Sequence, residues 1–217
     1  MSELLTRVGI IGDPHAEDEL LEKAIRFLRG EGVETLFCTG DVVTGRGDAN
    51  RCCRLLMDND VLTVRGNHDR WFFAPGYAEM FADSTPPDSI DAEAYAFLAT
   101  LPLTRRFETV RGTLQLAHGT DTDDMRGVYP GDARWVLEAN PPLQRLYAEN
   151  VYRFLVGGHT HARMVRQFDH LTIINAGTLR RDRSPGFLLA DFAAGAVQAY
   201  LFDEAGAIVP GDARPMG

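Results

Sequence analysis

Short apolar runs alternate with amphipathic helical patterns in the first third of the chain, and this alternation strongly restricts the fold. The runs at residues 8–11, 33–38 and 61–64 are short and rich in β-branched side chains, as buried strands are. Helical periodicity fills the two segments between them, at residues 17–30 and 49–57. Repeated strand–helix–strand units of this kind predict a parallel sheet with right-handed crossovers.

The second half of the chain has a different pattern, with strands in close succession. Hairpin turns are expected at 110–113 and 168–170. The expected strands lie at 114–117, 154–156, 171–174, 187–192 and 197–202. The sum of the two halves is a mixed α/β (α+β) protein with two sheets.

Length and composition favour one domain over residues 1–217, because 217 residues with 45% apolar side chains suffice for one sizeable core. Residues 71–103 contain Pro75, Pro86 and Pro87 and a helical pattern at 92–101, which predicts a helical excursion. A second helical segment is expected at 142–149. Either segment could be a lid, but a surface helix is the favoured interpretation.

The charge balance is acidic, with 22 basic and 31 acidic residues and a formal net charge of −9. This charge repels a phosphate backbone and argues against general nucleic-acid binding. The N-terminal residues contain no apolar run of about 18 residues, so neither a signal peptide nor a membrane anchor is expected. The three cysteines show no CxxC spacing, and Cys52 and Cys53 are expected to pack in the core, which favours a reducing cytoplasm.

Histidines follow the predicted strands with unusual regularity. Five of the six directly follow a strand, namely His15, His68, His118, His159 and His161, whereas His170 lies in a turn. Asp13, Asp41 and Asn67 share the same placement. A lone buried histidine is commonly a core residue, and a Gly-Asp or Gly-Asn pair is commonly only a turn. Because carboxyl ends of parallel strands face one crevice, the whole set predicts a shared site.

The residue types in this set point to metal binding. Asp13 and His15, like His159 and His161, are one residue apart, and in an extended segment both side chains of a pair lie on one side. Imidazole, carboxylate and amide ligands without thiolate suit Mn²⁺, Fe, Zn²⁺ or Ni²⁺ better than a structural zinc. Two ions that share one carboxylate would use all seven candidates, which are Asp13, His15, Asp41, Asn67, His118, His159 and His161.

The order of these motifs resembles that of the calcineurin-like metallophosphoesterases, whose motifs have the forms DxH, GD, GNH(D/E), H and GHxH. The matching segments are Asp13-x-His15, Gly40-Asp41, Gly66-Asn67-His68-Asp69, His118-Gly119 and Gly158-His159-Thr160-His161, across about 150 residues. The resemblance implies a four-layer sandwich, in which two mixed β-sheets pack face to face with helices on the outer faces.

The resemblance also implies a role for each ligand. One metal would be held by Asp13, His15, Asp41 and His161, and the other by Asp41, Asn67, His118 and His159, so that Asp41 bridges them. In similar enzymes the histidine that corresponds to His68 contacts the phosphoryl oxygen or protonates the leaving group.

Some residues depart from the family's patterns or lie beside its motifs. Thr44 stands where serine/threonine protein phosphatases have the acid of GDxxDRG, which argues against that branch; residues 45–50 and 175–178 are closer to small bacterial phosphodiesterases and diadenosine polyphosphatases. Asp69 could orient His68, although a surface turn is the commoner role. Arg70 could bind substrate as a fork onto phosphate, and Arg46 could reach the same crevice, but solvated arginines are equally typical. The arginines at 180–183 are more typical of a solvated loop than of a nucleotide clamp, although their position after Gly177 would also suit a clamp.

Together these features predict a dinuclear metal-dependent phosphoesterase, in which a metal-bridging hydroxide attacks a phosphodiester or related small phosphoester. Two divalent transition-metal ions are expected as cofactors, with Mn²⁺ first and Fe, Zn²⁺ or Ni²⁺ as alternatives. The alternative functions are a dinucleoside polyphosphate hydrolase, a phosphomonoesterase, and a scaffold protein that keeps the fold without the activity.

Overall fold

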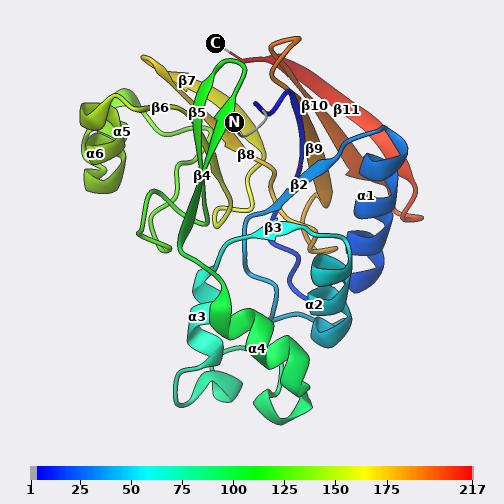
Figure 1. Ribbon diagram of the computed structural model, residues 1–217. Coiled ribbons are helices and arrows are strands. Elements are labelled where there is room, and N and C mark those ends of the chain that lie inside the picture. The colour runs from blue at the N-terminus through cyan, green and yellow to red at the C-terminus, as the bar shows by residue number, and fades with distance from the viewer. Residues whose placement is uncertain (1–3, 217) are drawn as a thin grey trace.

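The computed structural model describes residues 4–216 and contains eleven strands in two mixed sheets (Figure 1). The six-stranded sheet has the order β11 (Ile208–Pro215), β10 (Ala196–Phe202), β9 (Gly186–Asp191), β1 (Arg7–Ile11), β2 (Thr35–Cys38) and β3 (Leu62–Thr63). The five-stranded sheet has the order β4 (Thr104–Thr109), β5 (Gly112–Ala117), β6 (Tyr152–Gly157), β8 (Leu171–Asn175) and β7 (Met164–Phe168).

The predicted parallel start of the fold is confirmed. β1 pairs in parallel with β2, and β2 with β3. α1 (Asp18–Gly30) and α2 (Ala49–Asp58) make the two crossovers. The predicted apolar face of α1 is buried along its whole length, through Leu20, Leu21, Ala24, Ile25 and Leu28.

The hairpins of the second half are also confirmed, since β4 and β5, β7 and β8, and β9 and β10 pair antiparallel. Strand β11 was not expected, because its sequence carries two prolines and a glycine, which are typical of turns. It lies at the edge of the six-stranded sheet, where proline is tolerated because one side of the strand has no partner.

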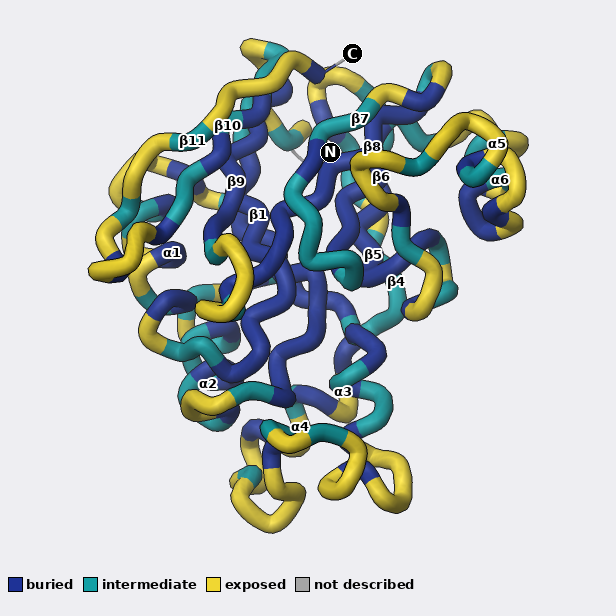
Figure 2. Tube along the Cα trace, turned by 180° about the vertical axis from the view of Figure 1, so that it is seen from behind, coloured by how far each residue is buried: buried dark blue, intermediate teal, exposed yellow. Residues whose placement is uncertain are grey.

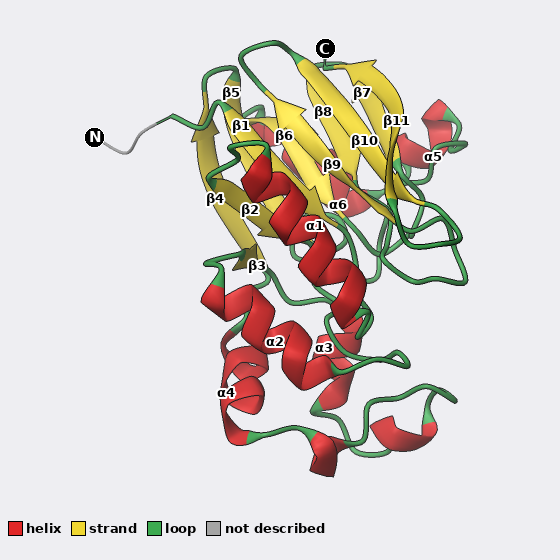
Figure 3. Ribbon diagram, turned by 90° about the vertical axis from the view of Figure 1, so that its right-hand side faces the viewer, coloured by secondary structure: helices red, strands yellow, loops and turns green. Residues whose placement is uncertain are grey.

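Three apolar clusters separate four layers, which confirms the predicted sandwich. One cluster lies between the sheets and includes Ile10, Phe37 and Phe154. The second lies between the six-stranded sheet and α1 and α2 (Figure 3). The third packs α5 (Arg134–Glu138) and α6 (Pro141–Glu149) on the five-stranded sheet. Burial is accordingly concentrated along the central strands, whereas the edge strand β11 is mostly exposed (Figure 2).

Residues 67–100 lie beyond the carboxyl ends of the first strands and consist of short helices (Figure 1). They are α3 (Asn67–Phe72), two 3₁₀ turns at Tyr77–Glu79 and Pro87–Ser89, and α4 (Ala92–Thr100). α4 buries Ala94 and Leu98 in the same cluster as α2. This placement puts the segment next to the loops that carry the predicted ligands.

The cysteines pack as expected. Cys38, Cys52 and Cys53 are buried and unpaired, and burial raises the pKa of each thiol. No helix within residues 4–216 has the length and apolarity needed to cross a bilayer.

Candidate metal centre

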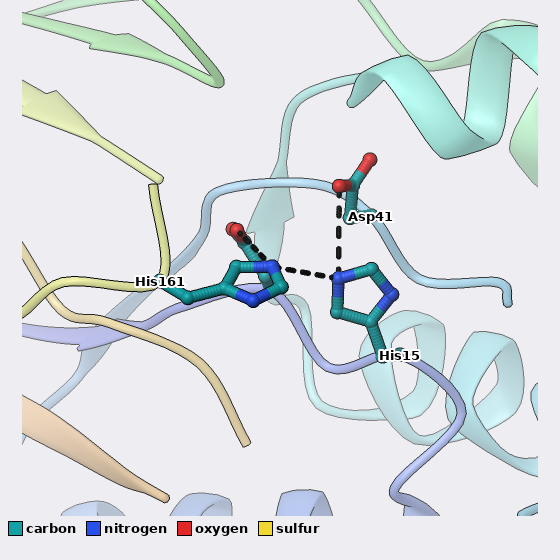
Figure 4. Close-up of side chains that lie close together, drawn as sticks. His15, Asp41 and His161 are labelled. Atoms are coloured by element: carbon teal, nitrogen blue, oxygen red, sulfur yellow. Dashed lines mark hydrogen bonds and ion pairs between the residues drawn. The ribbon is translucent and has the colours of Figure 1, made fainter. Parts of the chain in front are cut away.

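Four of the predicted ligands converge where β1, β2 and β6 end. The candidate ligand atoms of Asp13, His15, Asp41 and His161 all lie within 4.8 Å of one another. His15 Nε2 is 2.9 Å from His161 Nε2 and 3.7 Å from Asp41 Oδ2 (Figure 4). His161 Nε2 is 3.4 Å from Asp13 Oδ2. The structure therefore brings together all four residues of the first expected set.

A second group of ligand atoms forms around Asn67, at the start of α3. Its Oδ1 lies 2.9 Å from His118 Nε2 and 2.9 Å from His159 Nδ1. His118 Nε2 is in turn 3.3 Å from Asp41 Oδ2. These four residues are the second expected set, so Asp41 Oδ2 faces both groups.

The spacing of the ligand atoms fits metal coordination. Metal–nitrogen bonds of about 2.1 Å place neighbouring ligands about 3.0–3.4 Å apart at octahedral or tetrahedral angles. The distances around Asn67 Oδ1 and His161 Nε2 are 2.9–3.4 Å. With oxygen and nitrogen atoms only, the residues fit a pair of divalent transition-metal ions.

Backbone carbonyls fix the orientation of two ligand rings. His15 Nδ1 lies 2.9 Å from the Thr44 carbonyl, and His118 Nδ1 lies 2.8 Å from the Thr39 carbonyl. Because a carbonyl only accepts, each Nδ1 carries a proton, and Nε2 is the nitrogen that each ring turns toward the centre.

Asp69 is neither a surface residue nor a partner of His68, which corrects both interpretations of its role. Its carboxylate is buried and accepts the backbone N–H groups of Gly66, Asp41 and Val42 at 2.8–2.9 Å. It thereby joins the loop after β2 to the start of α3. The residue acts on the positions of Asp41 and Asn67 through the backbone.

Three further polar residues support the centre and were not expected. Thr39 donates its hydroxyl to Asp13 Oδ1 at 2.7 Å, and Thr178 donates to the Asp13 carbonyl at 2.7 Å. Asn175 donates to the Gly158 carbonyl at 2.7 Å. Thr39 and Asn175 both stand at a strand end, so the signal that marked the ligands also marks these residues.

The ligand loops have an unusual backbone. His15, Asp41, His159 and His161 all have left-handed φ angles, between 45° and 66°. The expectation that the pairs Asp13/His15 and His159/His161 stand in extended segments is therefore wrong. His159 and His161 lie in different groups, the first beside Asn67 and the second beside His15. Such conformations cost about 1–3 kcal/mol each and concentrate at functional sites.

Two motif glycines are required by close packing. A Cβ atom on Gly66 would overlap the Asp41 side chain, and one on Gly158 would overlap the Asp13 carboxylate. Neither glycine has a positive φ angle. The glycines of these two motifs thus let the backbone approach the metal-binding carboxylates.

The centre is buried and carries coupled charges. Asp13, His15, Asp41 and His118 are at most 1% exposed. Burial would lower the pKa of His118, but the carboxylates of Asp41 and Asp13 outweigh burial and raise it to about 10. Burial would raise the pKa of Asp41, yet His118 and His15 hold it well below its usual range. Cations are therefore strongly favoured between these carboxylates.

His68 lies against the first ligand group without joining it. Its ring centroid is 5.0 Å from that of His15, and Trp71 and Phe81 flank it at 5.0 and 4.7 Å. Its Nδ1 is buried and has no hydrogen-bond partner within residues 4–216, and burial lowers the pKa of the ring to about 4. Thr44 stands where protein phosphatases have an acid, but its hydroxyl pairs with the Tyr77 hydroxyl at 2.6 Å rather than with His68.

Arg70 lies near the centre but is engaged by a carboxylate. Its Nε and Nη2 donate to Asp124 at 2.6 and 2.9 Å, so the two N–H groups of Nη1 and one of Nη2 are left for another acceptor. Arg46 is exposed at the rim of a pocket that His15 also lines. The arginines at 180 and 181 form ion pairs rather than standing free in solvent.

His170 lies away from the metal centre. It precedes β8, at the end opposite to Asn175, and its ring stacks on Tyr147.

A two-sheet sandwich with a buried histidine–carboxylate centre at its strand ends is the arrangement expected of a metallophosphoesterase. Residues 6–195 match the family model described as the calcineurin-like phosphoesterase superfamily domain, so the chain belongs to that superfamily. Its domain is accordingly that of a metal-dependent phosphoesterase, a hydrolase of phosphate esters.

Individual relatives agree with this family. An uncharacterized protein of Methanocaldococcus jannaschii is 34% identical over 62 residues, which are 29% of this chain and 26% of that protein. A metallophosphoesterase from Sphaerobacter thermophilus has a similar structure, with a TM-score of 0.64 and 21% identity over 91% of this chain and 88% of that chain. A structure described as a novel archaeal phosphodiesterase has a TM-score of 0.57 and 17% identity over 90% and 99% of the two chains. At these identities, both structures show a shared fold.

Proposed function

We propose that the protein hydrolyses phosphodiesters with two divalent transition-metal ions. One ion would be held by Asp13, His15, Asp41 and His161, and the other by Asp41, Asn67, His118 and His159. The observation that carries the proposal is the position of Asp41 Oδ2, 3.7 Å from His15 Nε2 and 3.3 Å from His118 Nε2. Mn²⁺ is our first candidate, with Fe, Zn²⁺ and Ni²⁺ as alternatives, because the ligands are nitrogen and oxygen only.

Divalent ions at this centre would acidify a water molecule and neutralise charge on the phosphoryl oxygens. We assign His68 to contact with the phosphoryl group, because its ring lies beside His15 and its Nδ1 is unpartnered. An anionic phosphate beside the ring would favour its charged form and raise the lowered pKa, so that His68 could also donate a proton to the leaving alcohol. Trp71 and Phe81 hold this ring in place of the acid found in protein phosphatases. Arg70 can donate from Nη1 to a phosphoryl oxygen, while its hydrogen bonds to Asp124 fix the orientation of the guanidinium group.

The proposal includes the setting of the enzyme. We propose a single domain that acts in the cytoplasm on a small phosphoester and binds neither membranes nor nucleic acids in general. The net charge of −9 and the three unpaired, buried cysteines support this setting.

The test compares three substrates, namely bis(4-nitrophenyl) phosphate, 4-nitrophenyl phosphate and diadenosine tetraphosphate. Protein stripped by a chelator is assayed before and after Mn²⁺ is restored. We expect hydrolysis only with metal, and fastest for the diester. Full activity without metal would contradict the proposal. If the monoester or the dinucleotide is hydrolysed faster than the diester, that compound would take the place of the diester as the proposed substrate. Metal-loaded protein that hydrolyses none of the three would support the scaffold alternative.

A further inference from the structure

A pocket of about 430 Å³ adjoins the metal centre on the side of His15. The start of α1, the loop at 45–47, Asp83 and the loop after β8 surround it. Besides His15 and two glycines, its lining consists of five acidic residues and three arginines. Its volume lies within the range of about 300–1,000 Å³ that is usual for small-molecule sites. One arm of a substrate bound at the centre can therefore extend into a pocket whose lining side chains are all polar or charged.

Two of the lining arginines each serve a pair of carboxylates. Arg181 contacts Glu17 at 2.9 Å and Glu19 at 2.8 Å. Arg180 contacts Asp83 at 3.0 Å and Asp182 at 3.0 Å. Each arginine thus neutralises only half of the negative charge beside it.

The remaining charges leave the pocket with a negative excess. Asp18 pairs with Arg51, which stands behind the lining and also contacts Glu22. Arg46 has no ion-pair partner within residues 4–216. With Arg51 counted among the arginines, the walls still hold one more negative than positive charge.

This excess decides which substrate arm is favoured. The charge of the loaded centre would be about zero. It is the sum of two divalent ions, the carboxylates of Asp13 and Asp41, a hydroxide and a phosphodiester monoanion. The centre therefore does not neutralise the net negative charge of the pocket walls. A second phosphate in the pocket would be repelled by the walls. Hydroxyl groups would be accepted instead, because a carboxylate offers about four lone-pair sites and the arginines occupy only some of them.

We infer that the pocket receives an uncharged, hydroxyl-bearing arm of the phosphodiester, and that it excludes esters with a second phosphate group. The inference rests on the proposed function and selects among its substrates. A nucleoside or another sugar alcohol has the required chemistry, whereas dinucleoside polyphosphates do not.

The test uses two substrates with the same leaving group. Thymidine 5′-(4-nitrophenyl phosphate) is compared with the same ester carrying a 3′-phosphate. We expect the wild type to favour the ester without the 3′-phosphate by about 10-fold in kcat/KM. Glu19→Gln together with Asp182→Asn removes two negative charges from exposed positions, and should reduce this preference to about 2-fold.

A matched control changes the same charges elsewhere. Glu93→Gln with Glu204→Gln alters two exposed acids outside the pocket and should leave the preference at its wild-type value. Added salt should weaken the preference of the wild type, because screening reduces the repulsion.

Binding provides a readout that does not depend on turnover. Calorimetry with thymidine 5′-monophosphate and thymidine 3′,5′-bisphosphate, with and without Mn²⁺, should show weaker binding of the bisphosphate, and a smaller difference in the pocket variant. If these affinities hold while neither ester is hydrolysed, the inference stands and the proposed function fails. Three results would overturn the inference. They are that neither nucleotide binds, that the bisphosphate binds as tightly as the monophosphate or more tightly, or that the difference in affinity is unchanged in the pocket variant. If the bisphosphate binds more tightly than the monophosphate, Arg46 would be the residue that binds its second phosphate. Arg46→Gln would then remove the tighter binding of the bisphosphate.

Discussion

His68 has a side chain that touches the metal centre without belonging to either ligand group. If it donates a proton, the help should appear only when the leaving group needs one. We predict that His68→Ala retains both metals and loses about 10²- to 10⁴-fold in kcat/KM on alkyl or nucleoside esters. On 4-nitrophenyl esters the loss should be much smaller, because nitrophenolate leaves without a proton. The two kcat/KM values are measured on one preparation of known metal content.

Two outcomes would change the role of His68. Similar losses on both ester types would indicate electrostatic contact with the phosphoryl oxygen. Loss of metal in the variant would show that His68 is a ligand.

Gly158 is the glycine whose missing side chain makes room for a metal-binding carboxylate. We predict that Gly158→Ala lowers the free energy of unfolding by about 1–3 kcal/mol and reduces metal content, because the new Cβ overlaps the Asp13 carboxylate and the Thr39 hydroxyl. Urea unfolding and elemental analysis measure both effects. Gly131→Ala is the control, since its Cβ would meet nothing within 4 Å. Equal behaviour of the two variants would contradict the packing argument.

Among individual residues, the sequence predicts those site residues that directly follow a strand. The convergence of Asp13, Asp41 and His118 follows from the rule that strand ends share a crevice. The burial of Asp69 and the pairing of Arg70 with Asp124 could not be predicted, because they depend on loops 28 and 54 residues apart in the sequence. Only the folded chain shows which loop faces which.

At the scale of elements, the short helices at 67–100 support the ligand loops. The buried Tyr77 hydroxyl bonds Thr44 at 2.6 Å and accepts the Thr85 N–H at 3.3 Å. Thr44 in turn orients His15 through its carbonyl. The helical excursion is therefore tied to the metal centre by specific hydrogen bonds.

Removal of the Tyr77 hydroxyl tests the hydrogen bonds between the short helices and the ligand loops. We predict that Tyr77→Phe lowers the free energy of unfolding by about 1–3 kcal/mol, because the Thr44 hydroxyl stays buried without its partner. Tyr95→Phe, at a side chain that is 51% exposed, should change it by less than about 0.5 kcal/mol. Denaturant titration measures both, and an unaffected Tyr77→Phe protein would contradict the tie.

Strand β11 shows where prediction of elements fails. Its prolines and glycine are typical of a turn, and its pairing with β10 shifts register between Gln198 and Tyr200. Local sequence preferences could not reveal a strand that is stabilised by a neighbouring strand. The buried strands, in contrast, were recognisable because their apolar runs reflect burial on both faces.

At the scale of the whole molecule, the fold holds buried carboxylates and imidazoles from loops more than 140 residues apart in the sequence. Metal binding to the folded state alone should therefore stabilise the entire chain. We predict that Mn²⁺ at about 100 times its Kd stabilises the protein by about 2.7 kcal/mol, and that a chelator reverses this gain. Thermal unfolding monitored by calorimetry checks the shift. An unchanged Tm would show that the centre binds no metal under those conditions.

The carboxylate of Asp41 is the ligand that we propose two metal ions share. The most direct measurement is the metal content per chain after dialysis against Mn²⁺, determined by elemental analysis for the wild type, Asp41→Asn and His170→Ala. We expect about two ions in the wild type and in His170→Ala, and fewer than one in Asp41→Asn, because the shared carboxylate faces both ligand groups. Two ions retained in Asp41→Asn, or metal loss in His170→Ala as large as in Asp41→Asn, would contradict a shared Asp41.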